Sequence, residues 1–325
     1  MNRQQIKSSL LLLLTAVIWG TAFVAQSVGM NYVGPFTFNC VRSLIGGVVL
    51  IPCIFLLRRI RPDQSAAESG TDKAAVAKKG TDQTAAKNGP DRKRDKAVLV
   101  QGGIWCGILL FVASNLQQFG IAETTVGKAG FITALYIVIV PIAGLLFHKK
   151  CTPLIWGGVV LAVFGLYFLC MDESFSIQRG DFLVFLCAIA FSAHIMVIDH
   201  YTERADGVKM SCIQFFVCGL LSGICMLIFE NPDIANILAA WQPVLYAGVL
   251  SCGVAYTLQI VGQKGMNPTV ASLILSLESV ISALAGLVIL HQSLSGKETL
   301  GCVLMFCAII LAQLPWPLFK RKRAR

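Results

Sequence analysis

Charged residues are scarce in this sequence, at 14% of its 325 positions, whereas 56% are apolar and the mean hydropathy is +0.71. Soluble domains average about 25% charged residues, so this composition excludes an ordinary soluble domain and indicates a membrane protein. Lys and Arg outnumber Asp and Glu by 27 to 17, but they gather beside apolar segments and in one polar linker. That distribution is typical of cytoplasmic loops, so we expect no nucleic-acid binding.

Motifs for metal binding and for catalysis are also absent. The 12 cysteines include no Cys-x-x-Cys pair, and the 4 histidines form no Cys/His cluster with zinc spacing. Neither His-Glu-x-x-His nor Gly-x-Ser-x-Gly occurs, and no apolar stretch carries paired aspartates. Most of the cysteines lie in apolar stretches, as small buried side chains do. We therefore expect no metal and no cofactor, and an intramembrane enzyme is a disfavoured alternative.

Ten stretches are long and apolar enough to cross a bilayer as helices, which takes about 20 residues each. They are residues 8–28, 34–57, 98–120, 126–147, 154–171, 180–199, 209–229, 241–262, 269–290 and 297–316. The first stretch has a basic start but no clear small-residue cleavage site, so we interpret it as a retained transmembrane helix.

Basic residues predict the orientation of these helices. With the N-terminus inside, most Lys and Arg fall on the cytoplasmic side, including those of the C-terminal tail and of residues 58–96. Both termini are therefore predicted to be cytoplasmic, in a multi-pass protein of the cell (inner) membrane. Residues 58–96 have almost no large apolar side chains, so we expect a disordered cytoplasmic linker whose basic ends contact anionic lipid.

An internal repeat relates the two halves of the chain. The stretch NLQQFGIAETTVGKAGFITALY recurs as YTLQIVGQKGMNPTVASLILSLE, which aligns Gln117 with Gln259 and Tyr136 with Glu278. Five spans per half is an odd number, so the two halves enter the membrane from opposite sides. We predict an all-α membrane protein of two inverted five-helix repeats, residues 1–171 and 172–325. Secondary transporters built this way bind substrate near the midplane between the repeats.

Glu278 is an acid near the middle of the ninth apolar stretch. An isolated charge at mid-bilayer costs about 3 kcal/mol or more, so the carboxyl group should face a partner or a wet cavity. Two roles are open at this point: a structural hydrogen bond or ion pair, and a group that binds substrate and carries a proton.

Two basic residues lie within the predicted spans. Arg42 shares a helix face with Asn39 and Gly46, and a guanidinium stays charged, so it must be paired or solvated. Arg42 is predicted to face the cavity. Lys128 lies near an outer helix end, where its side chain can reach the interface.

Polar pairs recur at matched places in the two halves. Asn115 and Gln118 are three residues apart in the third span, and Tyr256 and Gln259 have the same spacing in the eighth. Each pair lines one helix face. Interhelical hydrogen bonding and ligand contact are equally good interpretations of any one residue, and the matched positions favour a shared cavity.

Three further side chains are candidates for the cavity. Trp19 and Tyr136 have aromatic rings that can stack on a substrate, although aromatic rings in membrane helices more often serve packing. His194 lies mid-span in the sixth stretch and can relay protons near neutral pH, while a buried and satisfied imidazole is the alternative.

Several runs of the sequence resemble one family of transporters. WGTAFVAQ, LQQFGIAETTVGKAGFITALYIVIVPI, GDFLVFLCAIAFSAHI and YAGVLSCGVAYTLQIVGQKGMNPTVASLILSLESV are similar, in order and spacing, to the drug/metabolite transporter superfamily, specifically EamA-type permeases. The resemblance covers both halves except residues 58–96. It implies ten helices in two inverted repeats and movement of small organic metabolites, commonly export.

The sequence departs from that family's pattern in two places. Members often carry Gly-Glu after the fourth and ninth spans, where this chain has His148-Lys149 and His291-Gln292. Many members also have proline after the ninth-span acid, where this chain has Ser279. The missing proline predicts a straighter ninth helix.

These observations predict a secondary transporter that moves small polar or amphipathic metabolites, amino acids or related compounds, by proton-coupled export. Glu278 is the predicted protonation switch. A proton-independent uniporter or exchanger is the main alternative, and a membrane receptor or scaffold is a disfavoured one. The expected partners are a small-molecule substrate, the lipid bilayer and protons, and the sequence leaves a homodimer open.

Overall fold

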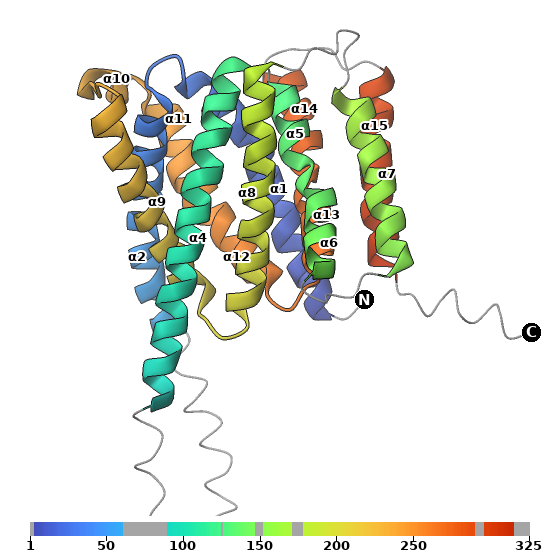
Figure 1. The fold of residues 1–325 in the computed structure, drawn as a ribbon, viewed down its shortest axis with the longest axis horizontal. Helices are drawn as coiled ribbons and strands as arrows, with labels where there is room; N and C mark the ends of the chain where they lie inside the picture. The colour runs from blue at the N-terminus through green and yellow to red at the C-terminus, as the bar shows by residue number, and fades with distance from the viewer. Residues whose placement is uncertain are drawn as a thin grey trace, which may run out of the picture.

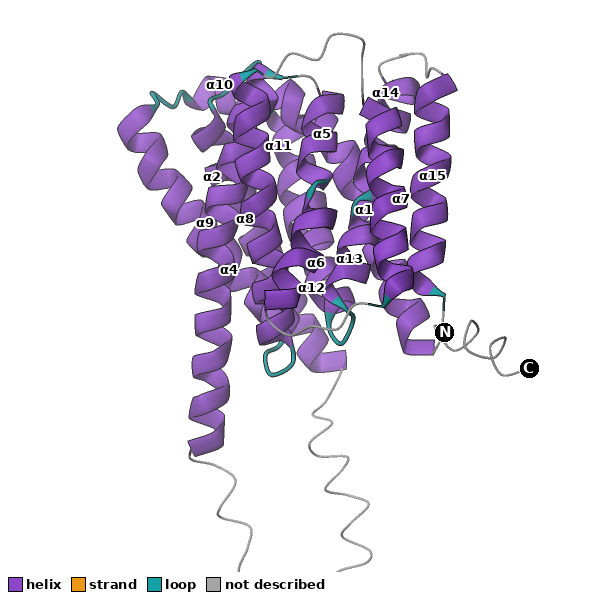
Figure 2. Ribbon diagram, turned by 45° about the vertical axis from the view of Figure 1, so that its right-hand side comes forward, coloured by secondary structure: helices purple, strands orange, loops and turns teal. Residues whose placement is uncertain are grey.

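The computed structural model describes residues 3–60, 90–124, 126–146, 152–170, 178–289 and 296–314, and every regular element within these ranges is a helix (Figure 1, Figure 2). In chain order the helices are α1 (Arg3–Gly29), α2 (Pro35–Ile60), α4 (Pro90–Glu123), α5 (Val126–Ala134), α6 (Tyr136–Leu146), α7 (Pro153–Cys170), α8 (Arg179–Thr202), α9 (Gly207–Phe229), α10 (Ile234–Ala239), α11 (Trp241–Leu245), the π-helix η2 (Tyr246–Tyr256), α12 (Thr257–Gln263), α13 (Pro268–Leu275), α14 (Leu277–Ile289) and α15 (Gly296–Gln313). A chain this apolar forms helices because a helix satisfies its own backbone groups where lipid cannot.

Eight segments of the described chain are long and apolar enough to span a membrane. They are Gln4–Gly29, Pro35–Leu56, Asp95–Glu123, Ala129–Leu146, Arg179–Thr202, Gly207–Phe229, Trp241–Gln263 and Pro268–Ala285. Each coincides with one of the ten predicted spans. The other two predicted spans correspond to α7 and α15, whose apolar portions are shorter, Pro153–Gly165 and Thr299–Ala312. The count of ten spans therefore stays a prediction.

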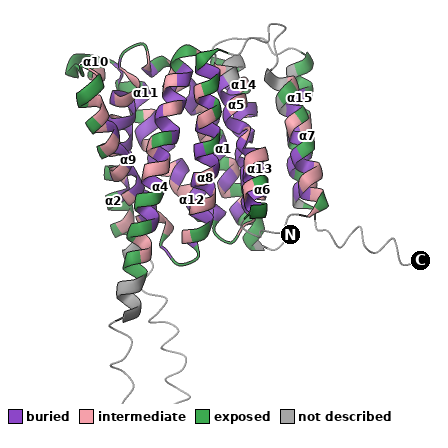
Figure 3. Cartoon of the chain, in the orientation of Figure 1, coloured by how far each residue is buried: buried purple, intermediate pink, exposed green. Residues whose placement is uncertain are grey.

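Large apolar side chains cover the outside of the helix bundle. Leu227, Phe229 and Val288 are each more than 70% exposed, and Figure 3 shows exposed residues along the outer faces of the helices. A water-soluble protein rarely exposes so much contiguous apolar surface, whereas a bilayer covers it. The buried polar residues lie inside the bundle, which is the arrangement expected of a protein surrounded by lipid.

The helices pack in pairs around α1. Helix α4 packs on α8 and α9, α2 on α9, and α7 on α15, while α1 contacts α14, α12 and η2. Helices α7 and α15 form one edge of the molecule, and α2, α9 and α10 form the opposite edge (Figure 1). Glycine permits the closest approach: a Cβ at Gly107 would lie 2.6 Å from Cβ of Val217 on α9.

Both ends of the predicted linker are helical. Helix α2 continues to Ile60 and α4 begins at Pro90, so residues 58–60 and 90–96 were wrongly assigned to a disordered segment. Lys and Arg are good helix formers, and a polar helix end continues freely beyond the apolar span. Residues 61–89 lie outside the described residues, as do His148 and His291.

Two spans are interrupted at matched places. Leu135 separates α5 from α6, and Ser276 separates α13 from α14. The break in the ninth span comes before Glu278 and does not need a proline, and the prediction that this helix is straighter than one with proline after the acid stays a prediction. Pro141, in turn, lies within α6 and not at the break. Discontinuous helices near the midplane are a recurring feature of transporter binding sites.

Candidate functional site

A pocket lies at the centre of the bundle, and ten helices contribute to its walls. Six of the nine residues predicted from the sequence line it: Trp19, Arg42, Tyr136, Tyr256, Gln259 and Glu278. Its free volume is about 30 Å³, which is room for one or two water molecules. A substrate therefore needs the surrounding helices to separate.

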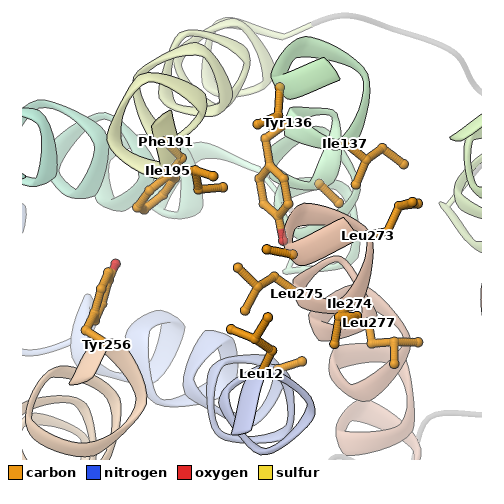
Figure 4. Packing of buried hydrophobic residues seen from close by; sticks show 14 of the residues in the cluster. Leu12, Tyr136, Ile137, Phe191, Ile195, Tyr256, Leu273, Ile274, Leu275 and Leu277 are labelled. Atoms are coloured by element: carbon orange, nitrogen blue, oxygen red, sulfur yellow. The ribbon is translucent and has the colours of Figure 1, made fainter. Parts of the chain in front are cut away.

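Apolar side chains complete the pocket between its polar groups. Leu275, Phe191 and Ile195 belong both to the lining and to the buried apolar cluster around it. In Figure 4, Tyr256 extends toward the helix that carries Phe191 and Ile195, and Tyr136 enters from another helix. The space is therefore amphipathic, with aromatic and aliphatic walls and a few polar groups, as small-molecule sites usually are.

Glu278 and Tyr136 join the two helix breaks. The Tyr136 hydroxyl donates a 3.0 Å hydrogen bond to Oε1 of Glu278, and Glu278 is only 4% exposed. Next to them, the Ser279 hydroxyl donates to the Gly130 carbonyl at 3.1 Å, which ties α14 to α5. The two residues that the repeat alignment matched are therefore direct partners across the pocket.

Arg42 brings a positive charge to the same pocket. Its Nη1 donates to Oε1 of Gln26 at 2.9 Å, and its guanidinium lies 5.5 Å from the centre of the Phe38 ring. Its Nε has no hydrogen-bond partner among the described residues, and no described carboxylate forms an ion pair with it. A buried cation without an acidic partner is expensive, so this position favours an anionic ligand.

Two more polar atoms of the pocket residues lack partners. Trp19 packs its ring against Tyr256, with ring centres 4.5 Å apart, and its Nε1 donor makes no hydrogen bond within the described chain. The same holds for the Oε1 acceptor of Gln259. Buried polar groups normally have partners, so a donor, an acceptor and a cation left open around one pocket make it the candidate ligand site, although five polar atoms outside the pocket in the described chain also lack partners.

Asn115 and Gln118 lie outside this pocket. The Asn115 side chain donates to the Phe111 carbonyl and to the Ser222 hydroxyl, and it accepts a 2.9 Å hydrogen bond from Asn39. It therefore connects α4 to α2 and α9. Gln118 donates to the Gln26 carbonyl at 3.1 Å. It therefore helps to position Gln26 on α1, whose side chain accepts a hydrogen bond from Arg42.

His194 also lies outside the pocket lining. It is fully buried, and its Nε2 lies 3.1 Å from Oε1 of Gln214. Its Nδ1 has no partner among the described residues. Its ring contacts Tyr256 edge-on at 6.2 Å, so His194 touches the pocket wall from behind. The side chain of Lys128 lies outside the described residues.

The structure adds four polar residues that the sequence reasoning did not select: Gln26, Gln117, Thr133 and Ser251. Gln117 donates to the Thr133 hydroxyl at 3.3 Å. One signal was available, because the repeat alignment placed Gln117 opposite Gln259. The shared three-residue spacing pointed instead to Gln118.

Comparison with known proteins assigns the chain to a family. The sequence profile of the EamA-like transporter family matches residues 6–81 and 178–314, which is more than half of the chain. The chain belongs to the EamA-like transporter family. It is therefore a multi-pass membrane transporter and not an enzyme.

Individual relatives of this EamA-like transporter agree with that assignment. An "Uncharacterized transporter" of Archaeoglobus fulgidus is 28% identical over 312 residues, covering 96% of this chain and 87% of the relative. The "Threonine/homoserine exporter RhtA" of Salmonella typhimurium is 25% identical over 181 residues, covering 54% of this chain and 58% of the exporter. A solved crystal structure matches 98% of this chain and 99% of its own with a TM-score of 0.69, and its 18% identity supports the fold alone.

Proposed function

We propose that this transporter exports small amphipathic metabolites that carry a carboxylate, such as amino acids or related compounds, across the cell (inner) membrane. Transport proceeds by alternating access around the central pocket. The two halves, residues 1–171 and 172–325, act as inverted five-helix repeats with both termini in the cytoplasm.

The observation that carries the substrate class is the unpaired guanidinium of Arg42 in the pocket. A substrate carboxylate supplies the counter-ion that no described residue supplies, and it accepts hydrogen bonds from Arg42 in the geometry that guanidinium prefers. The open Oε1 of Gln259 accepts a donor from the same molecule, such as an ammonium group. Trp19 and Tyr256 provide aromatic faces for its apolar part. The exporter similarity of part of the chain points to the same substrate class.

Proton coupling is proposed for Glu278. The carboxyl group is buried at a helix break and is hydrogen-bonded to Tyr136 from the opposite break. Loss or gain of its proton changes the charge between the two repeats, and so changes which arrangement of the halves is favoured. In such a cycle Glu278 carries one proton inward, down the proton gradient, in one arrangement change, and is deprotonated in the return change that carries one substrate outward.

The substrate class is tested by transport in proteoliposomes containing the purified chain. The panel pairs each amino acid with its amino alcohol, which keeps the ammonium and side chain but lacks the carboxylate. We expect flux of amino acids and at least a tenfold weaker response to the alcohols, since a charge-assisted hydrogen bond contributes about 1.5–3 kcal/mol. Equal responses to both members of a pair would reject the carboxylate assignment.

A proton-independent uniporter or exchanger is the second candidate. The observation in its favour is the Tyr136–Glu278 hydrogen bond itself, because a permanently bonded carboxyl group can serve as structure alone. Substrate flux with no accompanying proton movement in wild-type vesicles would support this candidate and reject coupling. It would leave the proposed pocket and substrate class intact.

A further inference from the structure

The connection between α9 and α11 carries a short helix that belongs to neither membrane span. The two apolar segments beside it end at Phe229 and begin at Trp241, so residues 230–240 lie where the chain turns at one membrane boundary. Helix α10 forms the second half of this connection, at the edge of the molecule beside α9 (Figure 1). It therefore lies at the level of the lipid headgroups.

The exposed surface of α10 has an apolar side and a side of small or polar residues. Ile234 and Leu238 are four residues apart, hence on one helix face, and they are 74% and 65% exposed. The other exposed positions of this helix are Ala235, Asn236 and Ala239, which share a different side because each residue turns the helix by about 100°. A helix of this kind lies in a membrane interface with its apolar side toward the acyl chains.

The apolar side of α10 continues a surface that faces lipid. Before it, Leu220, Ile224 and Leu227 follow one face of the α9 span and are each more than half exposed. After it, Trp241 is 56% exposed at the first residue of α11. Tryptophan is enriched at membrane–water interfaces, because its ring is apolar and its N–H group is polar. The bilayer that covers α9 therefore extends to α10.

Contacts with α2 hold α10 in this position. The Glu230 carboxylate, at the start of the connection, accepts hydrogen bonds of 2.9 and 2.8 Å from two backbone N–H groups in the first turn of α2. Ile237 packs on the buried apolar cluster that contains Phe38 of α2. Since the Arg42 guanidinium lies 5.5 Å from the centre of the Phe38 ring, α10 is attached to the helix that brings Arg42 to the pocket.

We propose that α10 is an interfacial anchor, which inserts Ile234, Leu238 and Trp241 among the lipid headgroups and the upper acyl chains. The anchor fixes the N-terminal end of α2 relative to the membrane surface. Its partner is the bilayer interface itself, and no particular headgroup is required because none of the three side chains is charged. The proposal does not depend on the substrate or on proton coupling.

Fluorescence quenching of the full chain in nanodiscs tests this proposal. An environment-sensitive fluorescent amino acid replaces Leu238, or Ala239 as the matched control on the other side of the same helix. The quenchers are iodide in water and lipids with a nitroxide at the headgroup, at the top of the acyl chain or at its end. At Leu238 we expect several-fold stronger quenching by the headgroup and chain-top nitroxides than by iodide, and at Ala239 the reverse.

Three results would overturn the proposal. Equal quenching by iodide at Leu238 and Ala239 would place both sides of α10 in water. Strongest quenching by the chain-end nitroxide would place the helix in the hydrocarbon core. Quenching at Leu238 by neither iodide nor lipid would show that protein, such as a second copy of the chain, covers this side.

Two charged variants separate the apolar side from the rest of the helix. With the fluorophore at Ile234, Leu238→Asp should raise iodide quenching several-fold, because a carboxylate resists transfer out of water. Ala239→Asp adds the same charge on the other side and should leave the quenching unchanged. Both positions are exposed, so neither change disturbs the packing of Ile237. An equal increase in the two variants would contradict an anchoring role for the apolar side.

Discussion

The third helix of the first half and its counterpart in the second half carry polar residues at the same spacing and use them differently. On α4, Asn115 and Gln118 face neighbouring helices, where they bond to α2, α9 and α1. Tyr256 and Gln259, at the end of η2 and the start of α12, face the pocket. Regular spacing thus identifies residues on one helix face. The elements packed against that face decide whether these residues make interhelical hydrogen bonds or contact a ligand.

The repeat alignment accounts for this difference. It matches Gln259 with Gln117, and both line the pocket, so Asn115 and Gln118 lie one residue away from the positions that match Tyr256 and Gln259. One residue turns an α-helix by about 100°, so the two polar pairs point in different directions within their halves. The π-helix η2, from Tyr246 to Tyr256, lies directly before the pocket-facing turn, and such segments are frequent at functional sites.

The largest effect is expected from Arg42→Gln, which removes the cation of the pocket. Substrate affinity should fall about 100-fold, the ~3 kcal/mol of two charge-assisted hydrogen bonds. Arg42→Lys keeps the charge but loses the fork geometry, so an intermediate loss is expected. Substrate binding to the purified protein measures both variants.

Thermal unfolding supplies the control for this experiment. Because no described carboxylate pairs with Arg42, its replacement leaves no orphaned acid, and the loss of its hydrogen bond to Gln26 is offset by removal of a costly buried charge, so the melting temperature should change little. A large drop in melting temperature, with affinity retained by the folded fraction, would make Arg42 a structural residue.

An intermediate effect is expected at the three glutamines, which compare pocket and packing directly. Gln259→Leu and Gln117→Leu should each weaken substrate binding by about tenfold, near the upper end of the ~1–1.5 kcal/mol of a buried hydrogen bond. Gln118→Leu should weaken it less, since Gln118 acts only through the Gln26 carbonyl. If Gln118→Leu lowers affinity most, Gln118 contacts the substrate and the assignment of its helix face to packing is wrong.

The sequence predicts the helices well and their interruptions poorly. Long apolar runs, with a backbone that must bond internally, identify eight spans close to their observed positions. The breaks at Leu135 and Ser276 have neither Gly nor Pro beside them, so no local signal marks them. They arise from packing between distant helices, which a local pattern does not contain.

For the site, the sequence identifies those residues whose type is rare in membrane helices. Arg42 and Glu278 stand out because charges seldom lie in membrane helices. Gln26, Thr133 and Ser251 do not, because such residues serve as interhelical hydrogen-bond partners throughout membrane proteins. Only the three-dimensional structure distinguishes the polar residues that face the pocket from those that pack between helices.

The smallest effect on binding is expected from Asn115→Ala, which tests the packing side of the comparison. It removes hydrogen bonds to Asn39 and Ser222, so stability should fall by about 1–3 kcal/mol while substrate affinity changes less than about twofold. Unfolding in mixed micelles measures the first and ligand titration the second. A loss of affinity larger than that of Gln259→Leu is the outcome that would place Asn115 in the binding site.

The most direct test of the account is substrate-driven proton movement in proteoliposomes that hold a pH-sensitive dye, comparing wild type with Glu278→Gln and Tyr136→Phe. We expect proton movement in wild type, none in Glu278→Gln, and a pH dependence displaced but present in Tyr136→Phe, because that variant removes the hydrogen bond and keeps the carboxyl group. Any substrate flux that remains in Glu278→Gln should not depend on pH. Equal proton movement in wild type and Glu278→Gln would contradict the coupling role and leave Glu278 as the helix partner of Tyr136.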